Sequence, residues 1–153
     1  MNREDARQEK WDYRFLALAR HLAEWSKDPT TKVGCVIVGP DNEVRALGYN
    51  GFPRDFDDVP ERFERPQKYL WIEHAERNAI YTAARTGVPL LGCRMYTTWF
   101  PCVDCARAAL QVGLAEVITV EPDWTAERWG PQLVDAHTLL RESDVKVRFL
   151  ENE

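Results

Sequence analysis

Residues 97–110 read TTWFPCVDCARAAL, and this stretch passes from a strand-like run into a helix-like run. Cys102 and Cys105 follow Pro101 and fall where the predicted helix begins. Two thiols at this spacing could form a disulfide, act as a redox pair or bind a metal ion. The sequence on either side of the stretch discriminates among these three possibilities.

The flanking sequence alternates helix-like and strand-like runs. Residues 11–25 carry apolar side chains at steps of three and four, which predicts an amphipathic helix that ends before Pro29. Two β-branched runs around a Gly-Pro-Asp-Asn turn predict a hairpin of strands 33–38 and 44–49. The other predicted elements are helices 75–84, 103–111 and 131–141, strands 94–98, 116–120 and 145–149, and a loop over 54–68.

This order of elements predicts one α/β domain over residues 1–153, with helices on both faces of a largely parallel sheet that keeps one antiparallel hairpin. No apolar run approaches the roughly 18 residues that cross a membrane. The charged residues 1–14 have no apolar core and do not resemble a secretory signal. We therefore expect a cytoplasmic protein without a membrane partner.

The net charge and the cysteine content exclude further classes of protein. The net charge of −5 argues against a protein that coats nucleic acid, because that function needs a basic face. A small-molecule substrate is expected instead, and an anionic one would require a few local basic residues. Four cysteines are too few for a disulfide scaffold in a chain of this length. In a reducing compartment, a close pair more often binds metal or performs redox chemistry.

The stretch IEHAERNAI, at residues 72–80, favours metal binding. A structural zinc site would need two further Cys or His ligands, whereas a catalytic site needs one further ligand and an open position for water. His74 begins a predicted helix and Glu76 follows it, and H-x-E followed by P-C-x-x-C is the zinc deaminase signature. We predict that His74, Cys102 and Cys105 bind one Zn²⁺ per chain and that Glu76 transfers protons.

Further blocks resemble the deoxycytidylate (dCMP) deaminase family. They are SKDPTTKVG at residues 26–34, GYNGFPR at residues 48–54, and the segments around His74 and Cys102. The resemblance covers about residues 15–120, and the tRNA-adenosine and riboflavin-pathway deaminases share the zinc signature but not these blocks. It implies a cytidine deaminase-like three-layer α/β/α sandwich with a mixed five-stranded sheet, assembled into homo-oligomers.

The same resemblance implies roles for residues that bind substrate. Asn50 would contact the sugar, and the backbone at Ala75 would lie against the base. Ser26, Lys27 and Arg54 are candidates for an anionic group, because a phosphate requires charge and hydrogen-bond donors. Lys27 could equally be a solvated helix end, and Arg54 an ordinary loop residue.

Aromatic residues near the motifs add a further question. Trp99 and Phe100 are candidates for the wall of the base pocket, with packing as the alternative. After the strand at 116–120, the family usually carries a tyrosine near the phosphate, whereas this chain reads EPDWTAERW with Trp124 in that place. Trp124 is a candidate substrate-binding residue, with packing or an oligomer interface as the alternative. The pocket could be reshaped for a substrate other than a plain 5′-monophosphate, or Arg128 could instead replace the missing phosphate contact.

Motif and resemblance together predict a hydrolase that acts on a C–N bond of a cyclic amidine. The expected reaction converts dCMP to dUMP and ammonia, with Glu76 delivering protons to the ring and to the leaving amine. The alternative keeps this chemistry on a nucleoside, a modified pyrimidine or another amino-heterocycle. A non-catalytic, zinc-stabilised binding protein is a third reading, and the presence of Glu76 argues against it because a structural site needs no such carboxylate.

Overall fold

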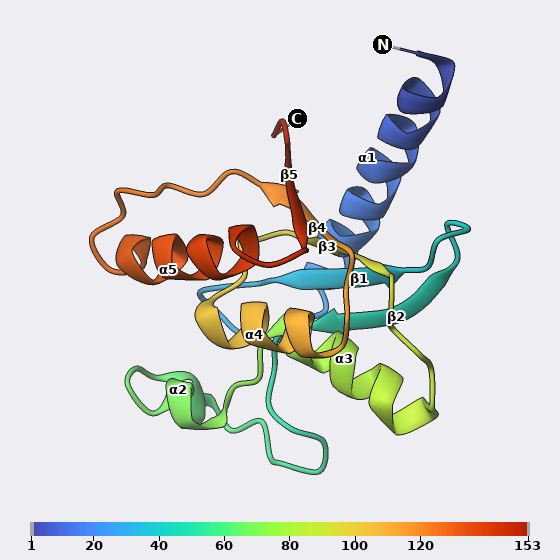
Figure 1. Ribbon diagram of the computed structural model, residues 1–153. Helices are drawn as coiled ribbons and strands as arrows, with labels where there is room; N and C mark the ends of the chain where they lie inside the picture. The colour runs from blue at the N-terminus through green and yellow to red at the C-terminus, as the bar shows by residue number, and fades with distance from the viewer. Residues whose placement is uncertain (1, 153) are drawn as a thin grey trace.

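A five-stranded sheet forms the centre of the computed structural model, which describes residues 2–152 (Figure 1). The strands lie in the order β2-β1-β3-β4-β5. They are β1 (Gly34–Val38), β2 (Val44–Tyr49), β3 (Arg94–Thr97), β4 (Glu116–Val120) and β5 (Lys146–Leu150). The predicted mixed sheet is confirmed. The expectation of a largely parallel sheet is wrong, because β1 pairs antiparallel with β3 as well as with β2, and only β3, β4 and β5 run parallel.

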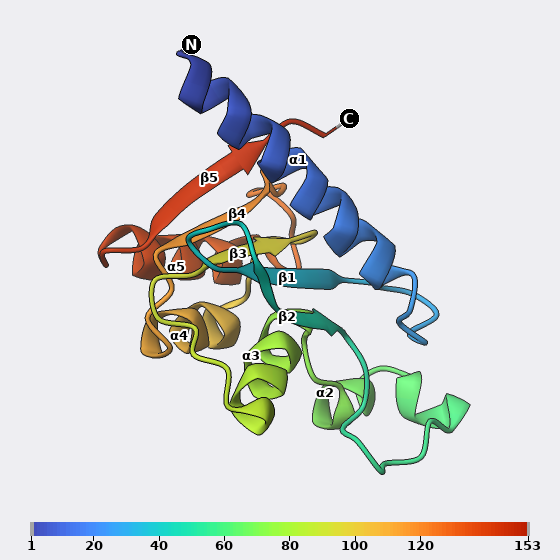
Figure 2. The ribbon, with the colours of Figure 1, turned by 90° about the vertical axis from the view of Figure 1, so that its right-hand side faces the viewer.

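Helices cover both faces of the sheet, as the resemblance implies. Figure 2 shows α1 on one side of the sheet and α3 and α4 on the other, and α5 packs beside α4. The helices are α1 (Arg3–Ala23), α2 (Lys68–Trp71), α3 (Ala75–Thr86), α4 (Val103–Gln111) and α5 (Gly130–Arg141), with a 3-10 helix η1 (Pro60–Phe63). No helix within residues 2–152 is long and apolar enough to cross a membrane.

Helix α1 begins at Arg3, well before the predicted start at residue 11. Asn2 caps it, because its side-chain oxygen accepts hydrogen bonds from the backbone N–H groups of Glu4 and Asp5, at 2.9 and 2.8 Å. The Asp5 carboxylate in turn accepts a bond from the Asn2 backbone N–H, which completes a capping box. The first two turns are exposed and have no apolar period, so the sequence pattern does not reveal them.

The segment between β2 and α3 has its own aromatic cluster. Phe52 stacks on Phe63 with 4.3 Å between ring centroids, and Phe56 lies 5.2 Å from the ring of Trp71. The guanidinium of Arg62 lies 3.9 Å from the centroid of the Phe56 ring. The expected loop over 54–68 therefore contains η1 and leads directly into α2, whose residues reach the functional site.

Two glycines allow helices to pack directly on strands. A Cβ at Gly48 of β2 would lie 2.2 Å from the carbonyl oxygen of Ala75 and 2.5 Å from the nitrogen of Ala79, both in α3. A Cβ at Gly34 of β1 would lie 1.8 Å from the carbonyl oxygen of Ala19 in α1. The close contact at Gly48 fixes the N-terminal turn of α3 against the sheet.

Candidate metal centre and substrate cavity

Two helix N-termini bring the predicted metal ligands together. His74 is the N-cap residue of α3, Cys102 is the N-cap residue of α4, and Cys105 lies in the first turn of α4. The Nδ1 atom of His74 is 3.4 Å from Sγ of Cys102 and 3.5 Å from Sγ of Cys105. All three ligand atoms lie within 4.8 Å of one another. The structure therefore brings the three predicted ligands into one cluster.

The spacing of these atoms fits a zinc ion. Tetrahedral Zn²⁺ with bonds of ~2.0 Å to nitrogen and ~2.3 Å to sulfur separates those two ligand atoms by roughly 3.5 Å. The observed nitrogen–sulfur distances of 3.4 and 3.5 Å agree with that value. Three protein ligands leave a fourth position free, which is the arrangement of catalytic zinc sites.

The electrostatics of the cluster favour a thiolate. The hydrogen bond with the Cys105 thiol lowers the pKa of Cys102 to about 4, although burial opposes this, and the hydrogen bond with His74 adds to the effect. The same hydrogen bond with Cys102 raises the pKa of His74 above its ordinary value. The hydrogen bond with Cys102 and burial raise the pKa of Cys105 in turn, so the negative charge resides on Cys102. Both cysteines lie at a helix N-terminus, where the helix dipole favours negative charge. A soft cation would therefore find a charged sulfur ligand near neutral pH.

Glu76 lies beside the ligand cluster in the first turn of α3. Its side chain is buried at 3% exposure, and its Oε2 atom is 3.7 Å from Sγ of Cys105. Burial raises the pKa of the Glu76 carboxyl above its ordinary value. A raised carboxyl pKa is typical of a group that must both accept and deliver protons near neutral pH.

A cavity of about 550 Å³ opens at the ligand cluster. His74, Glu76 and Cys102 line it, together with residues of α2, of segment 98–100 and of the segment that follows β4. This volume falls within the range of small-molecule sites. Four of the residues predicted to bind substrate line the same cavity: Asn50, Ala75, Trp99 and Phe100.

The side chain of Asn50 is held in place by the backbone of the neighbouring segment. Its Oδ1 atom accepts a hydrogen bond from the N–H of Val33, and its Nδ2 atom donates to the carbonyl of Thr31, both at 2.8 Å. Within residues 2–152, no acceptor takes the second N–H of the amide, which is left for a ligand. The hydroxyl of Ser26, which is buried, donates to the Asn50 carbonyl at 2.8 Å. Ser26 therefore supports the Asn50 backbone and is not among the residues that line the cavity.

The two basic residues predicted to bind an anion also lie away from the cavity lining. Lys27 is exposed and forms an ion pair with Asp58. Arg54 donates a hydrogen bond at 3.3 Å to the hydroxyl of Thr82 on the outer part of α3. The structure does not bring either residue to the metal ligands.

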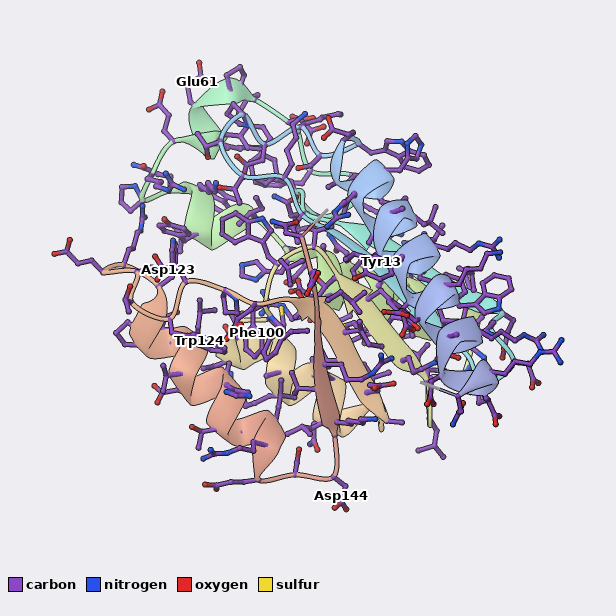
Figure 3. All side chains as sticks on the ribbon, turned by 90° about the horizontal axis from the view of Figure 1, so that it is seen from above. Tyr13, Glu61, Phe100, Asp123, Trp124 and Asp144 are labelled. Carbon is purple, nitrogen blue, oxygen red and sulfur yellow. The ribbon has the colours of Figure 1, made fainter. Side chains whose placement is uncertain are left out.

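Trp124 lies behind the cavity wall. Its ring is 5.2 Å from that of Phe100 and stacks on His137 of α5 at 5.0 Å, and Figure 3 shows Trp124 and Phe100 side by side next to α5. Phe100 lines the cavity and is 6% exposed, so Trp124 supports a wall residue from behind. Trp99 lines the cavity as well but is 53% exposed, which places it at the mouth.

A contact between α2 and the segment after β4 closes one side of the cavity. Tyr69 and Trp129 both line the cavity, and their rings lie 6.1 Å apart. Arg128 donates a hydrogen bond to the Tyr69 hydroxyl, and its guanidinium lies 4.8 Å from the centroid of the Trp129 ring. Arg128 is not itself a lining residue, so it braces the wall from outside.

Sequence reasoning missed several residues at this site. Tyr69 and Trp129 of the wall were not predicted, and neither was the buried ion pair between Asp28 and Lys68, which also lines the cavity. Asp28 belongs to the SKDP block, and that block was the available signal. No local pattern marks Lys68, because only the fold of the segment before α3 brings it inside.

Nitrogen and sulfur ligands at two helix N-termini, beside a buried carboxyl in an α/β/α sandwich, form a candidate zinc centre of the hydrolytic class. The chain belongs to the cytidine and deoxycytidylate deaminase zinc-binding family, whose model matches residues 9–121.

Proteins of similar sequence support this assignment. An uncharacterized deaminase of Aliivibrio fischeri is 38% identical over 144 residues, which cover 92% of this chain and 94% of the relative. The deoxycytidylate deaminase of Homo sapiens is 39% identical over 115 residues, covering 71% of this chain and 64% of the relative. A probable deoxycytidylate deaminase of Drosophila melanogaster is 42% identical over 119 residues, covering 71% of this chain and 58% of the relative. The match thus spans less than two thirds of either animal protein.

Solved structures show the same fold. The dCMP deaminase of cyanophage S-TIM5, determined in complex with dCMP and dUMP, superposes with a TM-score of 0.74. The two chains are 22% identical, and the superposition covers 98% of this chain and 99% of the phage chain. The cytidine deaminase-like sandwich expected from the resemblance is confirmed.

Proposed function

We propose that this protein catalyses the zinc-dependent hydrolytic deamination of a cytosine nucleotide, with dCMP and water as reactants and dUMP and ammonia as products. The observation that carries the proposal is the convergence of His74, Cys102 and Cys105 with the buried carboxyl of Glu76 on one cavity. Relatives named deoxycytidylate deaminase support dCMP as the substrate.

Each residue of the centre has a chemical task in this reaction. Zn²⁺ bound by the three ligands would supply Lewis-acid activation of water near neutral pH. Glu76 takes a proton from the attacking water as its oxygen adds to C4 of the cytosine ring, and delivers it to N3. The same carboxyl then carries the second proton to the amino group, so the C4–N bond breaks and ammonia leaves.

The cavity walls orient the substrate for this attack. The base would lie against the backbone at Ala75 with Phe100 as an apolar wall, since both residues line the cavity beside Glu76. Asn50 would offer its remaining amide N–H to a sugar hydroxyl, because its other polar atoms already bind the backbone. A side chain fixed in this way loses little conformational entropy when substrate binds.

A second substrate class deserves a test because of the segment after β4. Asp123 and Trp129 line the cavity, and an acidic side chain in the lining disfavours an anionic ligand nearby. Deoxycytidine or another uncharged amino-heterocycle is therefore the alternative substrate for the same centre. The homo-oligomer and the cytoplasmic location stay predictions.

Replacing Glu76 by glutamine tests the reaction. We expect zinc-loaded Glu76→Gln to retain its metal but to release ammonia from dCMP about 10²- to 10⁴-fold more slowly, since the proton carrier is lost. Glu61→Gln is the matched control, because Glu61 is an exposed residue of η1 (Figure 3) and does not line the cavity. Turnover by Glu76→Gln within tenfold of the parent would overturn the assignment. A substrate panel of dCMP, CMP, dCTP, deoxycytidine and amino-purines then identifies the substrate.

A further inference from the structure

Lys68, the first residue of α2, is a buried lysine on the cavity wall. It is 4% exposed and lines the cavity together with Asp28 and Asn50. Lysine is almost never fully buried unless its charge is paired. The question is therefore what this ammonium group does at the substrate site.

Asp28 holds the ammonium group in a fixed position. The Nζ atom of Lys68 forms an ion pair at 2.6 Å with Oδ2 of Asp28, which is fully buried, and donates a hydrogen bond to the hydroxyl of Thr30 at 3.1 Å. Burial alone would raise the pKa of Asp28, but the bonds from Lys68 and from the backbone of Thr30 and Thr31 outweigh it and lower that pKa. Asp28 therefore stays charged and orients Lys68.

The anchoring leaves at least one donor of Lys68 free. An ammonium group has three N–H bonds; among the described residues one of them donates to Thr30, and the Asp28 carboxylate pairs with the charge. The charge of Asp28 is shared, because its Oδ1 atom also accepts from the backbone N–H groups of Thr30 and Thr31, at 2.9 and 3.1 Å. Lys68 thus keeps both a donor and part of its positive charge for a ligand.

The same network reaches the residue proposed to bind the sugar. Thr31 carries the carbonyl that accepts from the Asn50 amide, and the backbone N–H of Thr31 is bound by Asp28. Lys68, Asp28 and Asn50 are therefore held by one short backbone segment. Groups that share one rigid support can contact adjacent parts of the same ligand.

Other charged side chains line the cavity without the same anchoring. Arg20 donates to the side chain of Asn152 at 3.0 Å, and Arg65 is exposed. Among the acidic groups, Asp123 accepts from the backbone and hydroxyl of Thr125. Lys68 is the cavity-lining cation that the fold both buries and fixes.

We propose that Lys68 binds the phosphate group of the nucleotide substrate and that Asp28 is its positioning residue. This inference rests on the proposed function and assigns the anion site to a residue other than Ser26, Lys27 and Arg54. Arg20 and Arg65 line the same cavity and add to the positive potential that receives the phosphate.

A comparison of dCMP with deoxycytidine tests this assignment, because the two substrates differ only in the phosphate. We expect Lys68→Met to lower kcat/KM for dCMP by about 10- to 100-fold, mainly through KM, with less than threefold change for deoxycytidine. Lys68→Arg should restore part of the loss. Lys10→Met is the control, because Lys10 is an exposed residue of α1, and it should change neither substrate.

A second variant controls for misfolding, because Lys68→Met leaves the buried Asp28 carboxylate without its partner. Asp28→Asn with Lys68→Met removes both charges and should show the same selective loss for dCMP. Equal losses on both substrates, or loss of phosphate preference in Lys27→Met instead, would overturn the inference. If the parent protein deaminates neither substrate, the proposed function fails. Calorimetry of dUMP and deoxyuridine binding to the zinc-loaded variants still tests Lys68 in that case: weakened binding of dUMP alone supports the inference, and unchanged dUMP binding overturns it.

Discussion

Replacing Gly48 by alanine tests how the strand–helix contact positions the metal centre. The added methyl carbon would lie 2.2 Å from the Ala75 carbonyl oxygen and 2.5 Å from the Ala79 nitrogen, whereas ordinary contacts begin near 3.4 Å. Both partners are backbone atoms of α3, so the helix or the strand has to move by about 1 Å. Overpacking of this kind costs about 1–3 kcal/mol of folding free energy. His74 and Glu76 would move with the helix.

Two measurements separate the effects of this change. Urea unfolding should show the loss of stability, and steady-state ammonia release from dCMP should fall by up to about 10²-fold, because a shift of about 1 Å misplaces Glu76 relative to α4. Gly51→Ala is the matched control for stability: a Cβ there meets nothing within 4 Å, and we expect a change within about 0.5 kcal/mol. If Gly48→Ala matched Gly51→Ala in stability and the parent in turnover, the reasoning would be refuted.

Three further predictions concern pH, the cavity wall and the metal. Burial alone would raise the pKa of Asp12, but hydrogen bonds from Arg148 and Tyr96 outweigh burial and lower the pKa. The charged Asp12 carboxylate therefore stabilises the fold fully above pH ~4, and this stabilisation fades as the pH falls further. Urea titrations should therefore show Asp12→Asn to be less stable by about 1–3 kcal/mol at pH 7, with the difference shrinking below pH 4; a constant difference would contradict this. Arg128→Ala should raise KM for dCMP about two- to fivefold with kcat unchanged, since it removes the brace on Tyr69, and an unchanged KM would show that the wall needs no brace. Chelation of the metal should lower the unfolding temperature and added Zn²⁺ should restore it, as calorimetry can measure; an identical temperature in both states would argue against a metal that links α3 to α4.

The sequence predicts most of the fold because local signals are strong where elements end. The bounds of β2, α4 and β4 agree with the predicted ranges, since turns and glycines flank regular apolar patterns. The start of α1 was missed because a cap at Asn2, not an apolar stripe, determines it. The pairing of β1 with β3 was missed because strand neighbours distant in sequence leave no local mark.

The residues of the candidate site also differ in whether the sequence predicts them. The ligands and Glu76 follow from motif spacing, because His74 and Cys102 each sit at the start of a helix whose pattern the sequence shows. Lys68 does not follow from spacing, because the partners that hold it in its buried position, Asp28 and Thr30, lie far from it in the sequence. Lys27 belongs to the SKDPTTKVG block, yet its side chain pairs with Asp58 and does not line the cavity.

The wall formed by α2 and the segment after β4 has a consequence for how this scaffold can diversify. The reactive groups sit on helices pressed against the sheet, whereas Tyr69, Arg128 and Trp129 contact one another across two short connecting segments. Substitutions or insertions in those segments alter the shape of the cavity without moving a metal ligand. The architecture thus separates the proposed reactive groups from the adjustable wall of the cavity, and directed evolution toward new amino-heterocycles should accumulate its changes in those two segments first.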